Sequence, residues 1–440
     1  MKEQISIPSS KIQRAASFAG TGVKLGGNYI KYYIKKAVNP DMNRDELNED
    51  NAEDIYSTLS KLKGSALKVA QMLSMDRNLL PTAYQNKFQM AQYSAPPLSY
   101  PLVLKTFKKE LNASPLEIFD EFTNSAVNAA SIGQVHKATK DGKSYAVKVQ
   151  YPGIADSVSS DLKIVKPIAV RLLNLKGNEV DKYFKEMEAK LLEETDYVLE
   201  LKQSVEIAEA CASIDGLLVP KYYSKWSSSK VLTMDWIEGQ PLGEFVSTCD
   251  DQVLRNRIGQ SLWDFYMYQI FDLRKVHADP HPGNFLITNE GKLGVIDFGC
   301  VKETSLEFHM LYFRLLNDKT LKNEELMDES LNRLEYILPE DSEEVKVIMK
   351  NSISEMLSLL GQPFNQESFD FSNDGFFKEL YDLGEKFAQS PEIRKANGAR
   401  GPKDALYINR TCFGLYSILN ILKAEVNTVA ARNYLNKLVD

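Results

Sequence analysis

Residues 277–284 read HADPHPGN and residues 297–299 read DFG, and these two short stretches indicate both the fold and the chemistry. They place Asp279 five positions before Asn284, and Asp297 thirteen positions after Asn284. An acid, an amide and a second acid at this spacing form a phosphoryl-transfer constellation. The first acid accepts a proton from the attacking group or orients it, while the amide oxygen and the second acid ligate Mg²⁺. We therefore expect the chain to handle nucleotide phosphates.

The parts that precede this loop follow the order of a two-lobed kinase fold. Residues 129–150 are expected to form a β-hairpin, because Asp141-Gly142 is a tight-turn pair between two strand-like runs. The second strand carries Lys148 on its small-residue face, which suits a lysine that contacts nucleotide phosphates. A helix over residues 186–200, a strand over residues 231–237 and a mostly helical remainder complete the pattern. We predict an α+β, atypical protein-kinase-like fold with two lobes.

The chain divides into four predicted segments. Residues 1–54 are first basic and then acidic, and residues 55–112 form a helical extension whose apolar residues recur at helical spacing from Ile55. Residues 113–237 form a kinase-like N-lobe, and residues 238–440 form a C-lobe that is mostly helical. The basic start also carries aromatic residues, so it is either a membrane-surface element or a solvated helix.

Composition excludes several classes of protein. A net charge of −7 argues against nucleic-acid binding, which normally needs a basic surface. The four cysteines are widely scattered and match neither a zinc pattern nor a disulfide framework. No long uncharged apolar run occurs, so we expect no integral membrane span and no signal peptide. The expected location is the cytoplasm, with peripheral contact to the inner face of a membrane left open.

Seven stretches, taken together, resemble the UbiB (AarF) family of atypical kinase-like proteins. Their residues are most similar to those of its coenzyme Q biosynthesis members. The resemblance runs from about residue 55 to residue 310. Besides HADPHPGN and DFG, it rests on GSALKVAQ at 64–71, AASIGQVH at 129–136, AVK at 146–148, QYPGI at 150–154 and ETDY at 194–197. The catalytic loop alone would suit aminoglycoside- or choline-kinase-like enzymes nearly as well.

The resemblance implies a role for each matching residue. Lys148 would contact the α- and β-phosphates of ATP or ADP and pair with Glu194. Asp279 would be the acid/base or water-positioning group, and Asn284 and Asp297 would ligate Mg²⁺. The implied partners are therefore a nucleotide and, near a membrane, a lipid or a quinone precursor.

Further implied contacts lie in the N-lobe and in the extension. Lys68 and Gln71 would be regulatory residues that cover the substrate cleft, and Asp196 would interact with that extension. Ala70 stands where the family has glycine, which puts the role of this motif in doubt. The remaining nucleotide-binding positions would be Ala129, Ala130, Ser131, Gly133 and Met234.

The loop at residues 129–131 has alanines where ordinary kinases use glycines. Glycines let backbone amides approach phosphate closely, so a Cβ there should change how a triphosphate binds. No Ala-Pro-Glu segment follows the DFG stretch to form a peptide-docking loop. These features favour slow ATP hydrolysis over protein phosphorylation.

Several alternatives stay open at this stage. The chain could be a small-molecule phosphotransferase of aminoglycoside- or choline-kinase type, or a non-catalytic pseudokinase that binds a lipid or a partner. Lys68 and Gln71 could be an ordinary solvated helix face, and Glu194 could belong to an exposed acidic face with Glu200. His277 is expected to brace the catalytic loop, and His281 to shape it.

Overall fold

The computed structural model describes residues 45–62, 98–129, 132–172, 179–389 and 400–439, together with isolated positions between residues 20 and 36. The described chain forms two compact units. The first comprises residues 1–202 and 221–236, and the second comprises residues 203–220 and 237–440. No described helix is both long enough and apolar enough to cross a lipid bilayer.

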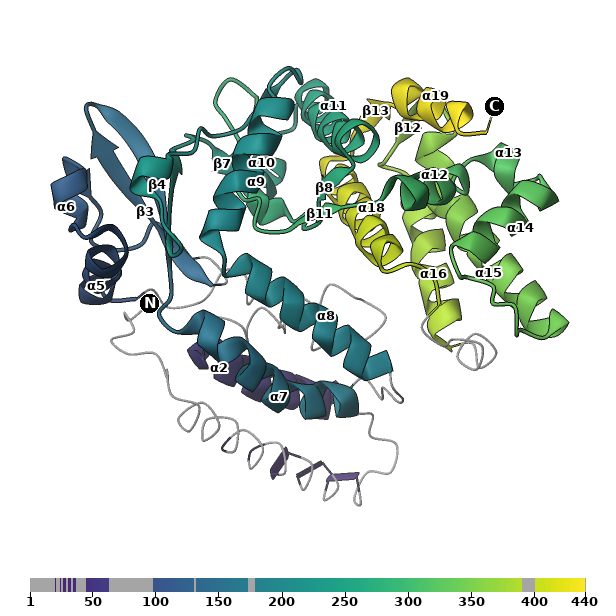
Figure 1. The fold of residues 1–440 in the computed structure, drawn as a ribbon, viewed down its shortest axis with the longest axis horizontal. Coiled ribbons are helices and arrows are strands. Elements are labelled where there is room, and N and C mark those ends of the chain that lie inside the picture. Colours follow the sequence, from purple (N-terminus) through teal and green to yellow (C-terminus); the bar gives the residue numbers. More distant parts are fainter. Residues whose placement is uncertain are drawn as a thin grey trace. The chain divides into compact units, whose positions relative to one another are not determined.

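The first unit is built on an antiparallel sheet (Figure 1). Its strand order is β1 (Glu121–Phe122), β3 (Gly133–Lys140), β4 (Lys143–Gln150) and β6 (Val231–Asp235), and β2 (Asn128–Ala129) also pairs with β3. Asp141 and Gly142 connect β3 to β4 with φ values of 50° and 73°. Positive φ at both central residues matches the right-handed twist of a hairpin, so the predicted hairpin is confirmed.

One face of this sheet is apolar and the other carries the predicted lysine. Tyr145, Val147 and Val149 of β4 are buried in a cluster with Phe107 of α5 (Tyr100–Leu111). The short helix α6 (Pro115–Ile118) leads from α5 into β1. Because side chains alternate along a strand, Lys148 lies on the opposite face from this cluster. The structure thus places Tyr145, Val147 and Val149 together on one face of β4.

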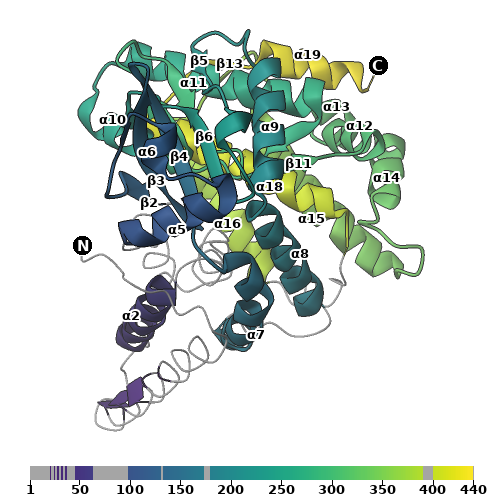
Figure 2. The same cartoon turned by 60° about the vertical axis from the view of Figure 1, so that its left-hand side comes forward.

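The other helices of the first unit differ from the predicted boundaries in two places. They are α2 (Asp45–Leu62), α7 (Ile154–Leu172) and α8 (Glu179–Glu194), together with the part of α9 (Tyr197–Ala210) up to Lys202. Helix α7 lies beside α8 (Figure 2). The helix expected from Ile55 already begins at Asp45, since the acidic stretch before it is helical. The single helix expected over residues 186–200 is wrong, because α8 ends at Glu194 and a new helix begins at Tyr197.

Three small sheets support the loops of the second unit. One has the order β5 (Leu217–Leu218), β10 (Leu293–Val295), β9 (Phe285–Ile287) and β7 (Gln240–Pro241). A second pairs β8 (Lys275–His277) with β11 (Val301–Glu303), and a third pairs β12 (Ser368–Asp370) with β13 (Glu425–Asn427). The first two of these sheets hold both ends of the HADPHPGN stretch.

The rest of the second unit is helical, as predicted. Its α-helices are α10 (Leu242–Thr248), α11 (Gln252–Tyr268), α12 (Leu306–Arg314), α13 (Asp318–Leu321), α14 (Glu324–Arg333), α15 (Glu343–Gly361), α16 (Asp374–Gln389), α18 (Lys403–Leu422) and α19 (Val429–Lys437). A π-helical turn at Gln269–Leu273 follows α11. Trp263 of α11 is fully buried against Phe364 and Phe371, so aromatic rings fill the centre of this unit.

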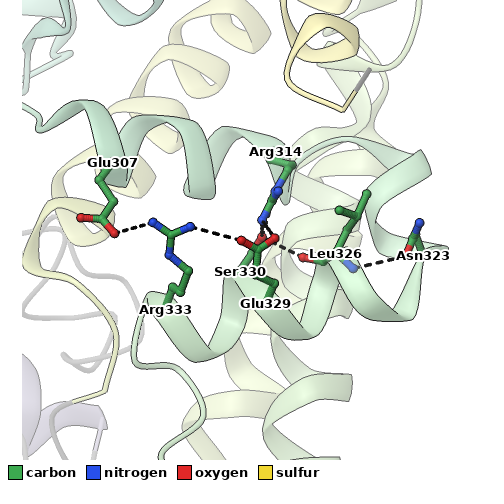
Figure 3. A network of polar contacts seen from close by, with 7 residues as sticks. All are labelled: Glu307, Arg314, Asn323, Leu326, Glu329, Ser330 and Arg333. Atoms are coloured by element: carbon green, nitrogen blue, oxygen red, sulfur yellow. Dashed lines mark hydrogen bonds and ion pairs between the residues drawn. The ribbon is translucent and has the colours of Figure 1, made fainter.

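A polar network joins α12 to α14 (Figure 3). Arg314 of α12 donates to Glu329 Oε2 and to Ser330 Oγ, both at 2.7 Å. Arg333 of α14 donates to Glu307 Oε1 of α12 at 2.7 Å. Each helix therefore supplies an arginine that pairs with a glutamate of the other. This network holds α12, which begins only a few residues after the DFG stretch, against its neighbour.

Candidate active site

Strand pairing brings the two sequence stretches of the second unit together. His277 of β8 pairs with Val301 of β11, and the Ala278 N–H donates to Cys300 O at 2.8 Å. On the other side of the loop, the Ile296 N–H donates to Asn284 O at 3.1 Å. These backbone bonds hold Asp297 and Asn284 in neighbouring positions, although the two residues are well separated along the chain.

Of the two motif histidines, His277 contacts α11 and the turn that follows it, whereas His281 bonds within the loop. The buried His277 ring contacts the Tyr266 hydroxyl through Nδ1 at 2.9 Å, and its backbone N–H donates to Gln269 Oε1 at 2.8 Å. His281 Nδ1 accepts the Gly283 N–H at 3.0 Å. These contacts agree with the bracing role predicted for His277 and the shaping role predicted for His281.

Asn284 and Asp297 each form a side-chain hydrogen bond to the backbone of their own loop. The Asn284 Nδ2 donates to Asp279 O at 2.9 Å, so the amide oxygen is the atom of this side chain that could contact a metal. Asp297 Oδ1 accepts the Gly299 N–H at 2.8 Å. An amide oxygen and a carboxylate are the hard oxygen donors that Mg²⁺ prefers, with phosphate and water completing its shell. The side chains therefore fit the predicted cation.

No group of three or more His, Cys, Asp or Glu side chains that could hold a metal occurs in the described part of the chain. A Mg²⁺ site of the kinase type does not need one, because the nucleotide supplies several ligands.

Asp279 has a partner that the sequence did not reveal. Its Oδ1 accepts a charged hydrogen bond from Arg410 Nη2 at 3.0 Å, and the side chains are 18% and 24% exposed. Arg410 lies on α18, far along the chain from the catalytic loop. Its only sequence signal is a charged residue within a largely apolar helix, and that pattern names no partner.

In the first unit, the buried Lys148 forms an ion pair with Glu200. Lys148 Nζ lies 2.8 Å from Glu200 Oε1, and the two side chains are 7% and 3% exposed. The lysine ammonium also lies 5.2 Å from the centre of the Tyr197 ring. Sequence reasoning named Glu194 as the partner and overlooked Glu200. Glu194 ends α8, and its pairing with Lys148 stays a prediction.

The break between α8 and α9 explains the position of Glu200. Asp196 Oδ1 accepts the N–H groups of Val198 and Leu199 at 3.0 and 3.1 Å, so Asp196 caps α9. Glu200 then lies in the first turn of that helix. Both Glu194 and Glu200 are buried, so the alternative of an exposed acidic face is wrong. An aspartate before a new apolar run was the signal that could have located this helix start.

The predicted phosphate loop is described only in part. Ala129 ends β2 and Gly133 begins β3, whereas Ala130 and Ser131 lie outside the described residues. A Cβ at Gly133 would lie 2.6 Å from Val149 O and 2.9 Å from the Tyr197 hydroxyl, so glycine is required there by close approach.

The other predicted positions are distributed as follows. Met234 is buried on β6, where it pairs with Ala146 of β4. Lys68 and Gln71 lie outside the described residues, and so does the rest of their motif. The contact predicted between Asp196 and the extension therefore stays a prediction.

Comparisons with known proteins bear on the family and the fold of the chain. A family model, the ABC1 atypical kinase-like domain, matches residues 90–331. The probable serine/threonine-protein kinase abkA of Dictyostelium discoideum is 24% identical over 464 residues, covering 98% of this chain and 80% of that protein. The mitochondrial atypical kinase coq-8 of Caenorhabditis elegans is 26% identical over 439 residues, and the match covers 96% of this chain but 57% of that protein.

A solved structure supports the fold directly. The Rv3197–erythromycin complex from Mycobacterium tuberculosis matches with a TM-score of 0.59 at 28% sequence identity, covering 90% of this chain and 97% of that chain. The predicted kinase-like α+β fold is therefore confirmed. With the family model matching more than half of its length, the chain belongs to the ABC1 (UbiB/AarF) family of atypical kinase-like proteins.

Proposed function

We propose that the chain is an ATP-binding, Mg²⁺-dependent atypical kinase-like ATPase that supports isoprenoid quinone or lipid metabolism. The observation that carries the proposal is the convergence of Asp279, Asn284 and Asp297 on one pair of hydrogen-bonded loops. Sequence spacing alone could occur by chance, whereas this backbone arrangement supports a working phosphoryl-transfer loop.

Each residue of the loop has a distinct task in this proposal. Asn284 and Asp297 would hold Mg²⁺, which neutralises charge on the nucleotide phosphates when bound. Asp279 orients the attacking water or hydroxyl, and Arg410 fixes one of its two carboxylate oxygens. In the first unit, Lys148 would contact the phosphates, while Glu200 holds its ammonium group in place within a buried environment.

The short segment after the DFG stretch bears on the substrate. The chain passes from Gly299 into β11 at Val301 and into α12 at Leu306. Arg314 and Arg333 then anchor α12 to α14. A peptide-docking activation loop needs a longer segment, so this connection favours water or a small molecule over a protein as phosphate acceptor.

The link to quinone or lipid metabolism rests on the resemblance to the coenzyme Q members and on the coq-8 relative. Profiling of quinones and lipids in cells that lack the protein tests this part. Complementation with Asp297→Asn should fail if nucleotide handling is required, and normal quinone and lipid levels without the protein would contradict the link.

The nucleotide site is tested with purified protein. We expect Mg-ATP or Mg-ADP to raise the melting temperature, and Asp297→Asn to abolish that increase. The matched control is Asp374→Asn, which removes an exposed carboxylate of the same unit. ATP hydrolysis is expected to be slow and to increase with phospholipid vesicles or phenol-like headgroup compounds. A wild-type protein without any thermal response to Mg-nucleotide would contradict the site assignment.

Two other assays separate the alternative functions. Transfer of labelled phosphate to a soluble alcohol, lost in Asp279→Ala, would identify a small-molecule phosphotransferase. Full quinone production by an Asp279→Asn chain would instead identify a non-catalytic binding module.

A further inference from the structure

We propose that α18 is a brace for the catalytic loop and that Arg410 is the positioning residue that orients the Asp279 carboxylate. The inference rests on the proposed function, since it assigns Asp279 a part in the reaction. The family model ends at residue 331, so α18 lies beyond the matched domain.

One face of α18 follows the catalytic loop along several turns. Positions 404, 407, 410 and 414 recur at three- and four-residue steps and therefore share a helix face. Asp404 Oδ1 lies 3.4 Å from Lys302 Nζ of β11, and Tyr407 is buried in a cluster with Ala278 and Cys300. Figure 1 shows α18 beside β8, in agreement with the contacts between these elements.

The next two turns of this face contact the reacting part of the loop. Arg410 Nη2 reaches Asp279 Oδ1 at 3.0 Å. A Cβ at Gly414 would lie 2.3 Å from Pro280 Cγ and 2.9 Å from Pro280 O. The helix backbone therefore touches the residue that follows Asp279, and no side chain fits between them. Loop and helix cannot shift independently in this direction.

Other contacts hold α18 in place. Just before the helix begins, Arg400 donates to Asp341 Oδ1 and Oδ2 at 2.5 Å each, and these side chains are 8% and 6% exposed. The Tyr312 hydroxyl of α12 donates to Asn409, and the Tyr416 hydroxyl donates to Leu360 O at 2.8 Å. Because these contacts fix α18, Arg410 holds the Asp279 carboxylate in a defined orientation.

The geometry of the guanidinium makes a specific prediction. Arginine presents planar N–H groups from a long side chain, whereas lysine is a flexible point charge. Arg410→Gln should lower kcat for ATP hydrolysis about 100-fold, as a misplaced catalytic group does, with little change in KM for Mg-ATP. Arg410→Lys should recover part of the lost kcat. Gly414→Ala should also lower kcat, because its methyl group displaces Pro280.

A double-mutant cycle distinguishes positioning from a general structural effect. If Arg410 acts through Asp279, then Arg410→Gln should cause no further loss of kcat in an Asp279→Asn background. Arg432→Gln removes a surface arginine of the same unit and should leave kcat unchanged. The thermal shift with Mg-nucleotide should be equal in wild type and in the Arg410 variants, which shows that the site is intact.

The outcomes are separable. Equal kcat for Arg410→Gln and wild type, or additive losses in the double variant, would overturn the inference while leaving the ATPase proposal standing. Unfolding of both the Gln and the Lys variants would assign Arg410 a purely structural role and would also overturn it. A wild-type chain that binds no Mg-nucleotide contradicts the proposed function itself.

Discussion

The buried pair of Lys148 and Glu200 allows the most quantitative prediction. Both side chains are less than one-tenth exposed and their charged atoms are 2.8 Å apart. Replacing Glu200 by Gln leaves the lysine ammonium in a buried place without its carboxylate. Removing one partner of a buried ion pair costs about 3–5 kcal/mol, because the remaining charge is desolvated without compensation. Since Gln retains a hydrogen-bonding oxygen, we expect the lower end, about 3 kcal/mol.

Thermal and urea unfolding measure this loss of the free energy of unfolding. For a unit of about 200 residues, 1 kcal/mol shifts the melting temperature by about 2–4 °C, so the expected decrease is about 6–12 °C. The matched control lies on the same helix. Glu206 pairs with Lys275 at the surface, so Glu206→Gln should cost less than about 1 kcal/mol.

A second substitution tests the stated cause. Lys148→Met in the Glu200→Gln chain removes the buried charge that has lost this carboxylate and should recover part of the lost stability. Similar small effects of Glu200→Gln and Glu206→Gln would refute the reasoning, because they would mean that Lys148 does not depend on Glu200. A large effect of Glu194→Gln alone would instead support the partner that the sequence suggested.

Three further predictions concern other sites. Gly133→Ala should destabilise the chain by about 2 kcal/mol in urea unfolding, because its methyl group would overlap Val149 O. Arg400→Met should cost about 2 kcal/mol by the same measurement, since it removes the arginine that holds the pKa of Asp341 down to about 2. Burial, helped by Arg274, lowers the pKa of His309 to about 4, so between pH 6.5 and 4 the unfolded chain binds a proton that the folded chain does not. The free energy of unfolding should therefore fall by about 2 kcal/mol from pH 6.5 to pH 5, and by less in His309→Phe. An equal pH dependence in both chains would contradict this assignment.

Much of the candidate site could be predicted because its residues lie close together in the sequence. The spacing of Asp279, Asn284 and Asp297 led to the loop that the structure holds together with backbone bonds. The hairpin with Lys148 was also predictable, since Asp141-Gly142 is a strong turn signal between alternating strands. These features depend on neighbours in the chain, and short-range patterns report such features well.

The helix break before Glu200 was not predicted from the sequence. A continuous run of helix-forming residues suggested one helix, whereas Asp196 caps a second one and changes which glutamate lies next to Lys148. The cap that Asp196 forms at the start of α9 could have been predicted from the sequence. Which of Glu194 and Glu200 pairs with Lys148 could not be predicted, because the answer depends on how the first turn of α9 faces β4.

Glycines, acids and turn residues at set spacings were enough to predict the family, the kinase-like fold and a candidate phosphate-binding loop. The ion-pair partner of Lys148 and the contact between Arg410 and Asp279 could be found only from the packing of the folded chain. Arg410 lies on a helix remote in sequence from the loop, and its contact depends on the close approach of Gly414 to Pro280. Such a contact follows from packing, in which each side chain is placed by the whole unit and not by its neighbours in the chain.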